Sequence, residues 1–158
     1  MNSSIMNRQR QDGVGLIEIL IAVLVLSIGF LGMAALQTKA LSNNNSAMAR
    51  TQATIASYSI LDAMRADRAN ALAGNYDTTV EVGNCPAAGG TLAGEQLNRW
   101  CSGTPGVTPP DGLAALGNGA EGEIDCDANG FCEITVTFDD EKATQGDDEQ
   151  EVVTRARL

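Results

Sequence analysis

The sequence predicts an α+β fold, in which one long N-terminal α-helix packs on a small antiparallel β-sheet. An apolar run covers residues 14–36, and no proline occurs before position 86. The helix is therefore expected to continue to residue 72. Alternating apolar and polar residues return at 123–158, a pattern that is typical of strands.

The apolar run is long enough to cross a membrane. At about 1.5 Å per residue, 14–36 would form a helix of roughly 35 Å. Arg8 and Arg10 precede it, which places the N-terminus in the cytoplasm and the rest of the chain in the periplasm. Gly29 and Gly32 interrupt the run and favour either close packing between helices or a softened segment.

Glu18 is the one ionisable residue in this run. A carboxylate at the centre of a membrane costs about 2.5–3.5 kcal/mol on insertion scales, and less near the interface. Either Glu18 lies shallow enough to reach the lipid headgroups, or it meets a positive partner from another copy or another protein. A plain membrane anchor has no use for such a residue.

A short basic leader, then Gly13, then an apolar residue, with a glutamate at the fifth position after the glycine, resembles the class III signal of type IV pilins and type II secretion pseudopilins. The resemblance implies that a prepilin peptidase cuts between Gly13 and Val14 and methylates Val14. It also implies that Glu18 pairs with the N-terminal amine of a neighbouring subunit during assembly. A secretory signal peptide would have a shorter apolar core. Met6 offers an alternative start.

A second resemblance covers roughly the first 70 residues. The segments 26–33 (LSIGFLGM) and 61–66 (LDAMRA) are similar to those of PilV-type minor pilins. This implies a pilin-like fold and a role in starting pilus assembly and in the tip complex, with adhesion and twitching motility downstream. The implied partners are other minor pilins, the major pilin, a tip adhesin, the prepilin peptidase and the inner membrane, before transfer to the pilus at the cell surface. The alternatives are a minor pseudopilin of a type II secretion system and a plain single-span anchored periplasmic domain.

The predicted organisation comprises five segments: a leader (1–13), a transmembrane and assembly helix (14–36), its amphipathic continuation (37–72), a disulfide-closed loop-rich segment (73–122) and an antiparallel sheet segment (123–158). Along the amphipathic continuation, a single apolar stripe is predicted to pack on the sheet: Leu41, Met48, Ile55, Tyr58, Leu61 and Met64.

The loop-rich segment contains all four prolines. Within it, 78–82 is predicted to be a strand and 92–100 a short helix with Leu97 and Trp100 turned inward. Residues 105–122 show no periodicity and are expected to be loop or partly disordered. The later strands are expected at 123–126, 131–138 and 151–158.

Four cysteines follow the membrane segment, an even number that indicates two disulfides in an exported domain. Their spacing matches no usual zinc site. A three-residue hairpin loop with Gly130 in the left-handed conformation would place Cys126 opposite Cys132, at a Cα separation of about 4.5–5.5 Å that suits a disulfide. Cys85 is then left to pair with Cys101.

The same hairpin contains the first half of a calcium-loop pattern, with Asp125, Asp127 and Asn129 at alternate positions before Gly130. The position where a bidentate glutamate belongs is Val136. Aspartate and asparagine are also ordinary turn residues, so a hairpin turn is the favoured interpretation and calcium the alternative.

The net charge is −10, and the chain contains no histidine. A strongly negative net charge argues against nucleic-acid binding, which needs a positive face to meet phosphate. Without histidine, a phosphate-binding glycine loop or a nucleophile motif, the sequence offers no case for an enzyme or a cofactor. Two acidic triplets, 139–141 and 147–149, are expected to be a solvated loop, with a cation site or a docking surface as alternatives.

Overall fold

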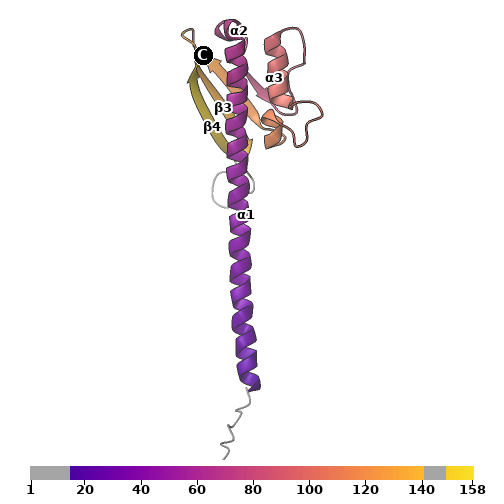
Figure 1. Ribbon diagram of the computed structural model, residues 1–158, viewed down its shortest axis with the longest axis vertical. Helices are drawn as coiled ribbons and strands as arrows, with labels where there is room; N and C mark the ends of the chain where they lie inside the picture. The colour runs from indigo at the N-terminus through magenta and orange to yellow at the C-terminus, as the bar shows by residue number, and fades with distance from the viewer. Residues whose placement is uncertain (1–14, 141–148) are drawn as a thin grey trace, which may run out of the picture. The chain divides into compact units, whose positions relative to one another are not determined.

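The structure is a computed structural model that describes residues 15–140 and 149–158. The chain divides into two compact units, Met1–Ala40 and Leu41–Leu158. One long helix, α1 (Leu16–Ala66), supplies the helical portion of the first unit and continues into the second (Figure 1). The helix and a four-stranded antiparallel sheet confirm the predicted α+β class.

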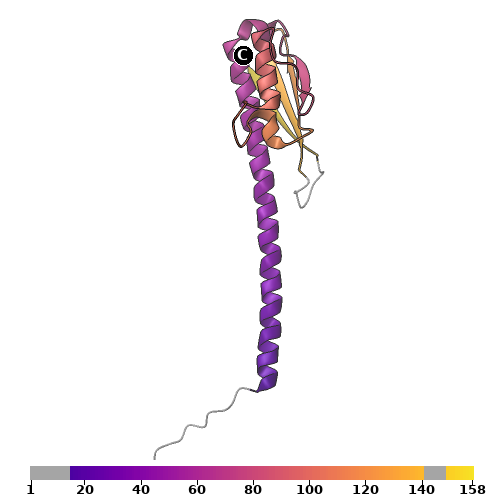
Figure 2. The ribbon, with the colours of Figure 1, turned by 90° about the vertical axis from the view of Figure 1, so that its right-hand side faces the viewer.

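The second unit has two layers, with α1 and α3 on one side and the strands on the other (Figure 2). The strands are antiparallel and lie in the order β1-β2-β3-β4. After α1 the elements are α2 (Arg68–Leu72), β1 (Thr78–Glu81), α3 (Leu92–Ser102), the 3-10 helix η1 (Gly112–Leu116), β2 (Glu121–Cys126), β3 (Phe131–Asp139) and β4 (Glu149–Arg157).

The predicted helix is interrupted before its expected end. Asp67 leaves the helical conformation (φ −118°, ψ 45°) between α1 and α2. Its carboxylate accepts a hydrogen bond from Asn70 Nδ2 at 2.7 Å. The hydroxyl of Tyr76, a fully buried residue, lies 3.2 Å from Asp67 Oδ2 and 2.6 Å from Gln96 Oε1. Burial, together with the Asp67 carboxylate, raises the pKa of Tyr76 to about 12. Asp67 therefore joins α2 to the chain that follows.

The face of α1 that packs on the sheet is not the predicted stripe. Leu61 and Met64 are buried as predicted, but the prediction was wrong for Leu41, Met48, Ile55 and Tyr58, each of which is more than half exposed. The buried residues of α1 that precede Leu61 mostly have small side chains: Ala53, Ala56, Ser57 and Ile60. Small side chains bring the helix close enough for Trp100 Nε1 to donate to the carbonyl oxygen of Ala56 at 3.0 Å.

Helix α3 begins where the Thr91 side chain accepts a hydrogen bond from the Gly94 N–H at 3.1 Å, an ordinary N-cap. Leu97 and Trp100 point inward and are 7% and 4% exposed, as predicted. The Trp100 ring packs against β2 at Gly122, where a Cβ atom would lie 2.3 Å from Trp100 Cη2. A glycine is therefore required under this ring.

The segment 105–122 contains more structure than its sequence indicates. The expectation of loop or partial disorder was wrong for η1, in which Leu113 is fully buried. Asp111 precedes η1 and accepts a hydrogen bond from Thr104 Oγ1 at 2.7 Å. Hydrogen bonds from Thr104 hold the pKa of the Asp111 carboxyl below its ordinary value. One buried leucine and one local carboxylate thus order a segment that has no periodic pattern.

The β2–β3 hairpin has the predicted register. Cys126 pairs directly with Cys132, and Gly130 has the left-handed conformation with φ 81°. The Asp127 N–H donates to the Phe131 carbonyl at 2.8 Å and closes the loop. The inward side chains of β3 are almost fully buried against the helices: Cys132, Ile134, Val136 and Phe138. Only one face of the sheet is covered, so polar residues alternate along the other.

Candidate assembly site

Glu18 lies in the first turn of α1. The helix starts beside it, where its N–H donates to the Gly15 carbonyl at 2.9 Å. The side chain is exposed and has neither an ion pair nor a hydrogen bond to any residue that the structure describes. An acidic group at a helix N-terminus is favoured by the helix dipole. The predicted cleavage site, Gly13 and Val14, lies outside the described residues, and the pairing role of Glu18 stays a prediction.

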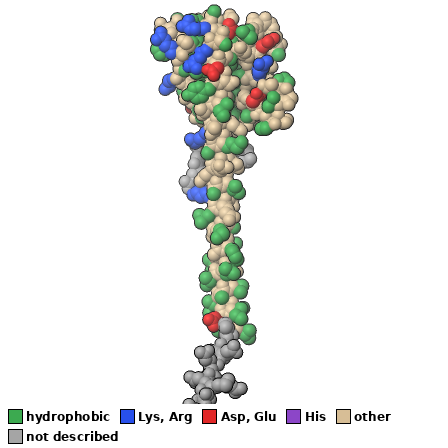
Figure 3. All heavy atoms as spheres, in the orientation of Figure 1, with side chains coloured by type: hydrophobic (Ala, Val, Ile, Leu, Met, Phe, Trp, Pro, Cys, Tyr) green, Lys and Arg blue, Asp and Glu red, His purple; other side chains and the backbone are tan. Residues whose placement is uncertain are grey.

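The helix after Glu18 presents apolar side chains in every direction. All residues from 16 to 40 are exposed, and most of them are apolar. Within the described ranges α1 is the one helix long and apolar enough to span a membrane. Figure 3 shows hydrophobic side chains along this stretch of α1. Such a surface requires lipid or other apolar helices around it.

Gly29 and Gly32 lie within regular α-helix. A Cβ atom at either position would meet nothing within 4 Å, so the chain itself sets no requirement for glycine there. Of the two explanations offered by the sequence, close approach of another helix fits this open space.

The wrongly predicted stripe forms a second exposed apolar surface, which we call the apolar seam: Leu41, Met48, Ile55 and Tyr58. The first three residues are spaced by seven, so they lie along one side of α1. Their exposed fractions are 66%, 57%, 63% and 53%. Because the sheet covers the Ala53 and Ala56 side of the helix, the apolar seam faces away from the core.

The residues of the calcium-loop pattern, Asp125, Asp127 and Asn129, lie in and beside the turn of the β2–β3 hairpin. Asp127 Oδ1 accepts hydrogen bonds from the N–H groups of Asn129 at 2.8 Å and Phe131 at 2.9 Å. These bonds, that of Phe131 foremost, hold the pKa of Asp127 below its ordinary value. Two effects raise the pKa of the neighbouring Asp77. The larger is burial of its own carboxyl, and the smaller is the nearby Asp125 carboxylate. No group of three or more acidic, histidine or cysteine residues suited to a metal occurs in residues 15–140 and 149–158.

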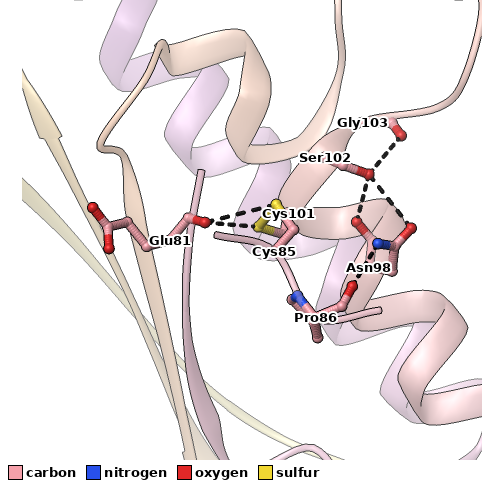
Figure 4. Close-up of a disulfide and its surroundings, with 7 residues drawn as sticks. All are labelled: Glu81, Cys85, Pro86, Asn98, Cys101, Ser102 and Gly103. Carbon is pink, nitrogen blue, oxygen red and sulfur yellow. Dashed lines mark hydrogen bonds between the residues drawn. A yellow bond between two sulfur atoms is a disulfide. The ribbon is translucent and has the colours of Figure 1, made fainter. Parts of the chain in front are cut away.

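The two disulfides join the pairs expected from the sequence. The Cα atoms are 5.6 Å apart in Cys85–Cys101 and 4.1 Å apart in Cys126–Cys132. Figure 4 shows the first disulfide beside the Glu81 carbonyl oxygen, which lies 3.3 Å from Cys101 Sγ. It fastens the segment after β1 to the end of α3.

A side-chain amide supports that link. Asn98 Nδ2 donates to the Pro86 carbonyl at 2.6 Å, next to the Cys85–Cys101 disulfide (Figure 4). Two adjacent contacts therefore hold the β1–α3 connection on the helix.

The acidic triplets are only partly described. Asp139 is exposed, Asp140 is buried and Glu149 is exposed at the start of β4, whereas Glu141, Asp147 and Asp148 lie outside the described residues. Sequence reasoning missed the burial of Asp140 and the exposure of the apolar seam. The one signal for the seam was the small-residue spacing of Ala53, Ala56, Ser57 and Ile60, which marks the opposite face of α1 as the packed one.

The comparisons with known proteins bear on the N-terminal region of the chain. Neither the curated proteins nor the solved structures gave a match to the chain. A family model described as the prokaryotic N-terminal methylation motif matches residues 8–34. The matched range contains Gly13, Val14, Glu18 and the start of α1. The chain therefore carries the class III signal of type IV pilins, which implies processing by a prepilin peptidase and supports a type IV pilin-like or pseudopilin-like structural protein.

Proposed function

We propose that the chain is a minor type IV pilin of the PilV type, which helps to start pilus assembly and takes part in the tip complex. The observation that carries the proposal is Glu18, an exposed carboxylate without a partner among the described residues, on an exposed apolar helix within the methylation motif. The resemblance of 26–33 and 61–66 to PilV-type pilins supports the finer assignment.

The mechanism we propose is assembly. After cleavage at Gly13, the new Val14 amine of one subunit is the positively charged partner of the Glu18 carboxylate of a neighbour. In apolar surroundings an ion pair is strongly attractive, whereas a charge left without its partner is strongly disfavoured. The pair therefore specifies the register of neighbouring helices. The apolar surface of α1 packs with other pilin helices as it leaves the lipid, and the apolar seam extends that surface beyond residue 40. The partners are the major pilin, other minor pilins and a tip adhesin.

The test replaces Glu18 in cells that carry the variant as their only copy. Glu18→Ala should leave membrane insertion and cleavage intact, and should reduce incorporation into sheared pili by at least about tenfold, equivalent to about 1.4 kcal/mol. The matched control is Ser27→Ala in the same helix, because the Ser27 hydroxyl already donates to the Val23 carbonyl at 2.7 Å. Incorporation of Glu18→Ala at the wild-type level would contradict the proposal.

The pseudopilin alternative shares the methylation motif, so it predicts the same cleavage. It differs in location: a pseudopilin would be absent from sheared pili, and loss of the gene would block protein secretion. A plain anchored domain would remain in the inner membrane whatever residue occupies position 18. Fractionation of pili, membranes and secreted protein therefore separates the three.

A further inference from the structure

A pocket of about 440 Å³ lies at the end of β3 within the second unit. Three segments far apart in sequence meet there, namely the middle of α1, the chain after η1 and the last residues of the third strand. The lining residues are Asn45, Met48, Ala49, Gln52, Leu116, Asn118, Asp139 and Asp140. Five of these eight side chains carry an oxygen atom.

Asp140 is the unusual member of this pocket. It is 6% exposed, and its Oδ2 atom is buried without a hydrogen-bond partner in the described portion of the chain. A carboxylate removed from water and given no donor is strongly disfavoured in its charged form. Other aspartates of this chain avoid that situation, since Asp127 accepts two backbone N–H groups and Asp111 accepts the Thr104 hydroxyl. Asp140 Oδ2 therefore meets no positive group or hydrogen-bond donor among residues 15–140 and 149–158.

The neighbours of Asp140 carry oxygen atoms that are not used in hydrogen bonds by the part of the chain that the structure describes. The side-chain amides of Asn45, Gln52 and Asn118 make no hydrogen bond with any described residue. Asp139 adds an exposed carboxylate on the opposite face of β3, beside the pocket rather than in it. Carboxylate and amide oxygens, with water, are the ligands that Ca²⁺ takes in flexible sites, whereas Mg²⁺ needs a near-ideal octahedron. The pocket presents no histidine or cysteine among its described lining residues, which argues against a transition metal.

We propose that this pocket binds Ca²⁺, with the Asp140 carboxylate as the central ligand. The amide oxygens of Asn45, Gln52 and Asn118 complete the site together with water, while Asp139 on the opposite face of β3 adds negative charge nearby without being a ligand. Bound calcium would join α1 to the end of β3. The site is separate from the β2–β3 hairpin, where the Asp127 carboxylate already accepts backbone N–H groups. The proposal does not depend on the function proposed above.

The test uses the full chain in a non-ionic detergent, after treatment with a chelator. Calorimetric titration with CaCl₂ should find one site with a Kd of about 0.1–1 mM, the range of extracellular calcium modules. At about 10 mM Ca²⁺ the Tm should rise by roughly 5 °C. Asp140→Asn, which keeps the shape of the side chain, should weaken calcium binding at least tenfold and reduce the rise in Tm by about half or more.

Two further variants keep the result interpretable. Gln52→Ala should weaken calcium binding without removing the buried carboxylate, whereas Glu123→Gln on the exposed face of β2 should bind calcium like the wild type. A wild-type chain that shows no calcium response would overturn the proposal. An equal response to Mg²⁺, or a calcium response that Asp140→Asn retains, would overturn it as well.

Discussion

Gly122 is a residue at which the second unit has no room for a side chain. A Cβ atom there would lie 2.3 Å from Trp100 Cη2 and 2.8 Å from Leu113 Cδ1, well inside van der Waals contact. Neither neighbour has room to move, since Trp100 is 4% exposed and Leu113 is fully buried. Gly122 therefore allows α3 and η1 to approach the sheet closely.

We expect Gly122→Ala to lower the free energy of unfolding by about 1–3 kcal/mol, the usual cost of overpacking a core. Chemical denaturation monitored by circular dichroism measures it. Gly29→Ala is the control, because a Cβ atom there meets nothing within 4 Å and its effect on the second unit should be negligible. Equal stability of the two variants would show that the layer can shift to make room.

At the scale of the element, the β1–α3 connection depends on its disulfide. Cys85–Cys101 closes a loop of sequence separation 16, and Cys126–Cys132 closes one of only 6. On the chain-entropy model the longer loop contributes about 3 kcal/mol and the shorter one about 2 kcal/mol. The hairpin is also held by the strand pairing of β2 with β3, which does not depend on the disulfide.

We therefore expect the double substitution Cys85→Ser with Cys101→Ser to destabilise the chain more than Cys126→Ser with Cys132→Ser. Urea denaturation of both variants measures the difference.

Peptide mapping under non-reducing conditions should find the two linked pairs and no free thiol. A Cys101–Cys126 link would contradict the pairing and the hairpin register with it.

The elements differ in how far the sequence predicts them. The long helix and the hairpin follow from strong local signals, namely an unbroken helix-forming run and a glycine at position 130 that permits φ 81°. The packed face of α1 does not, because large apolar residues are the usual sign of a core and here they are exposed. At the buried Ala56, the carbonyl oxygen accepts a hydrogen bond from Trp100 Nε1. These residues are 44 positions apart in the sequence, so no local pattern reveals the contact.

The candidate sites divide in the same way. Glu18 is conspicuous in the sequence because it is alone in an apolar run. Asp140 is not, because it is one of several acids in a row and only the fold decides which of them is buried. Burial of a single acid depends on three segments meeting at the end of β3, so it required the structure.

At the scale of the whole molecule, the chain combines an N-terminal helix exposed on all sides with a separate unit that has its own core. The methylation motif predicts that a leader is removed from the start of this helix by cleavage. We expect the mature chain to begin at Val14 and to carry one added methyl group, as intact-mass measurement would show. Gly13→Val should leave residues 1–13 attached and keep the protein in the inner membrane. Retention of the leader by the wild type, in cells with an active prepilin peptidase, would contradict the expectation.

The single tryptophan of the chain has an optical consequence. Trp100 is nearly inaccessible to water, and its ring lies where α1, α3 and β2 meet. Its fluorescence should therefore be emitted at short wavelength in the native chain and shift to longer wavelength when these three elements separate. Since no other tryptophan contributes to the signal, the emission spectrum reports on that one junction. The state of the second unit can thus be followed in micelles or vesicles that contain this chain alone, without an attached dye.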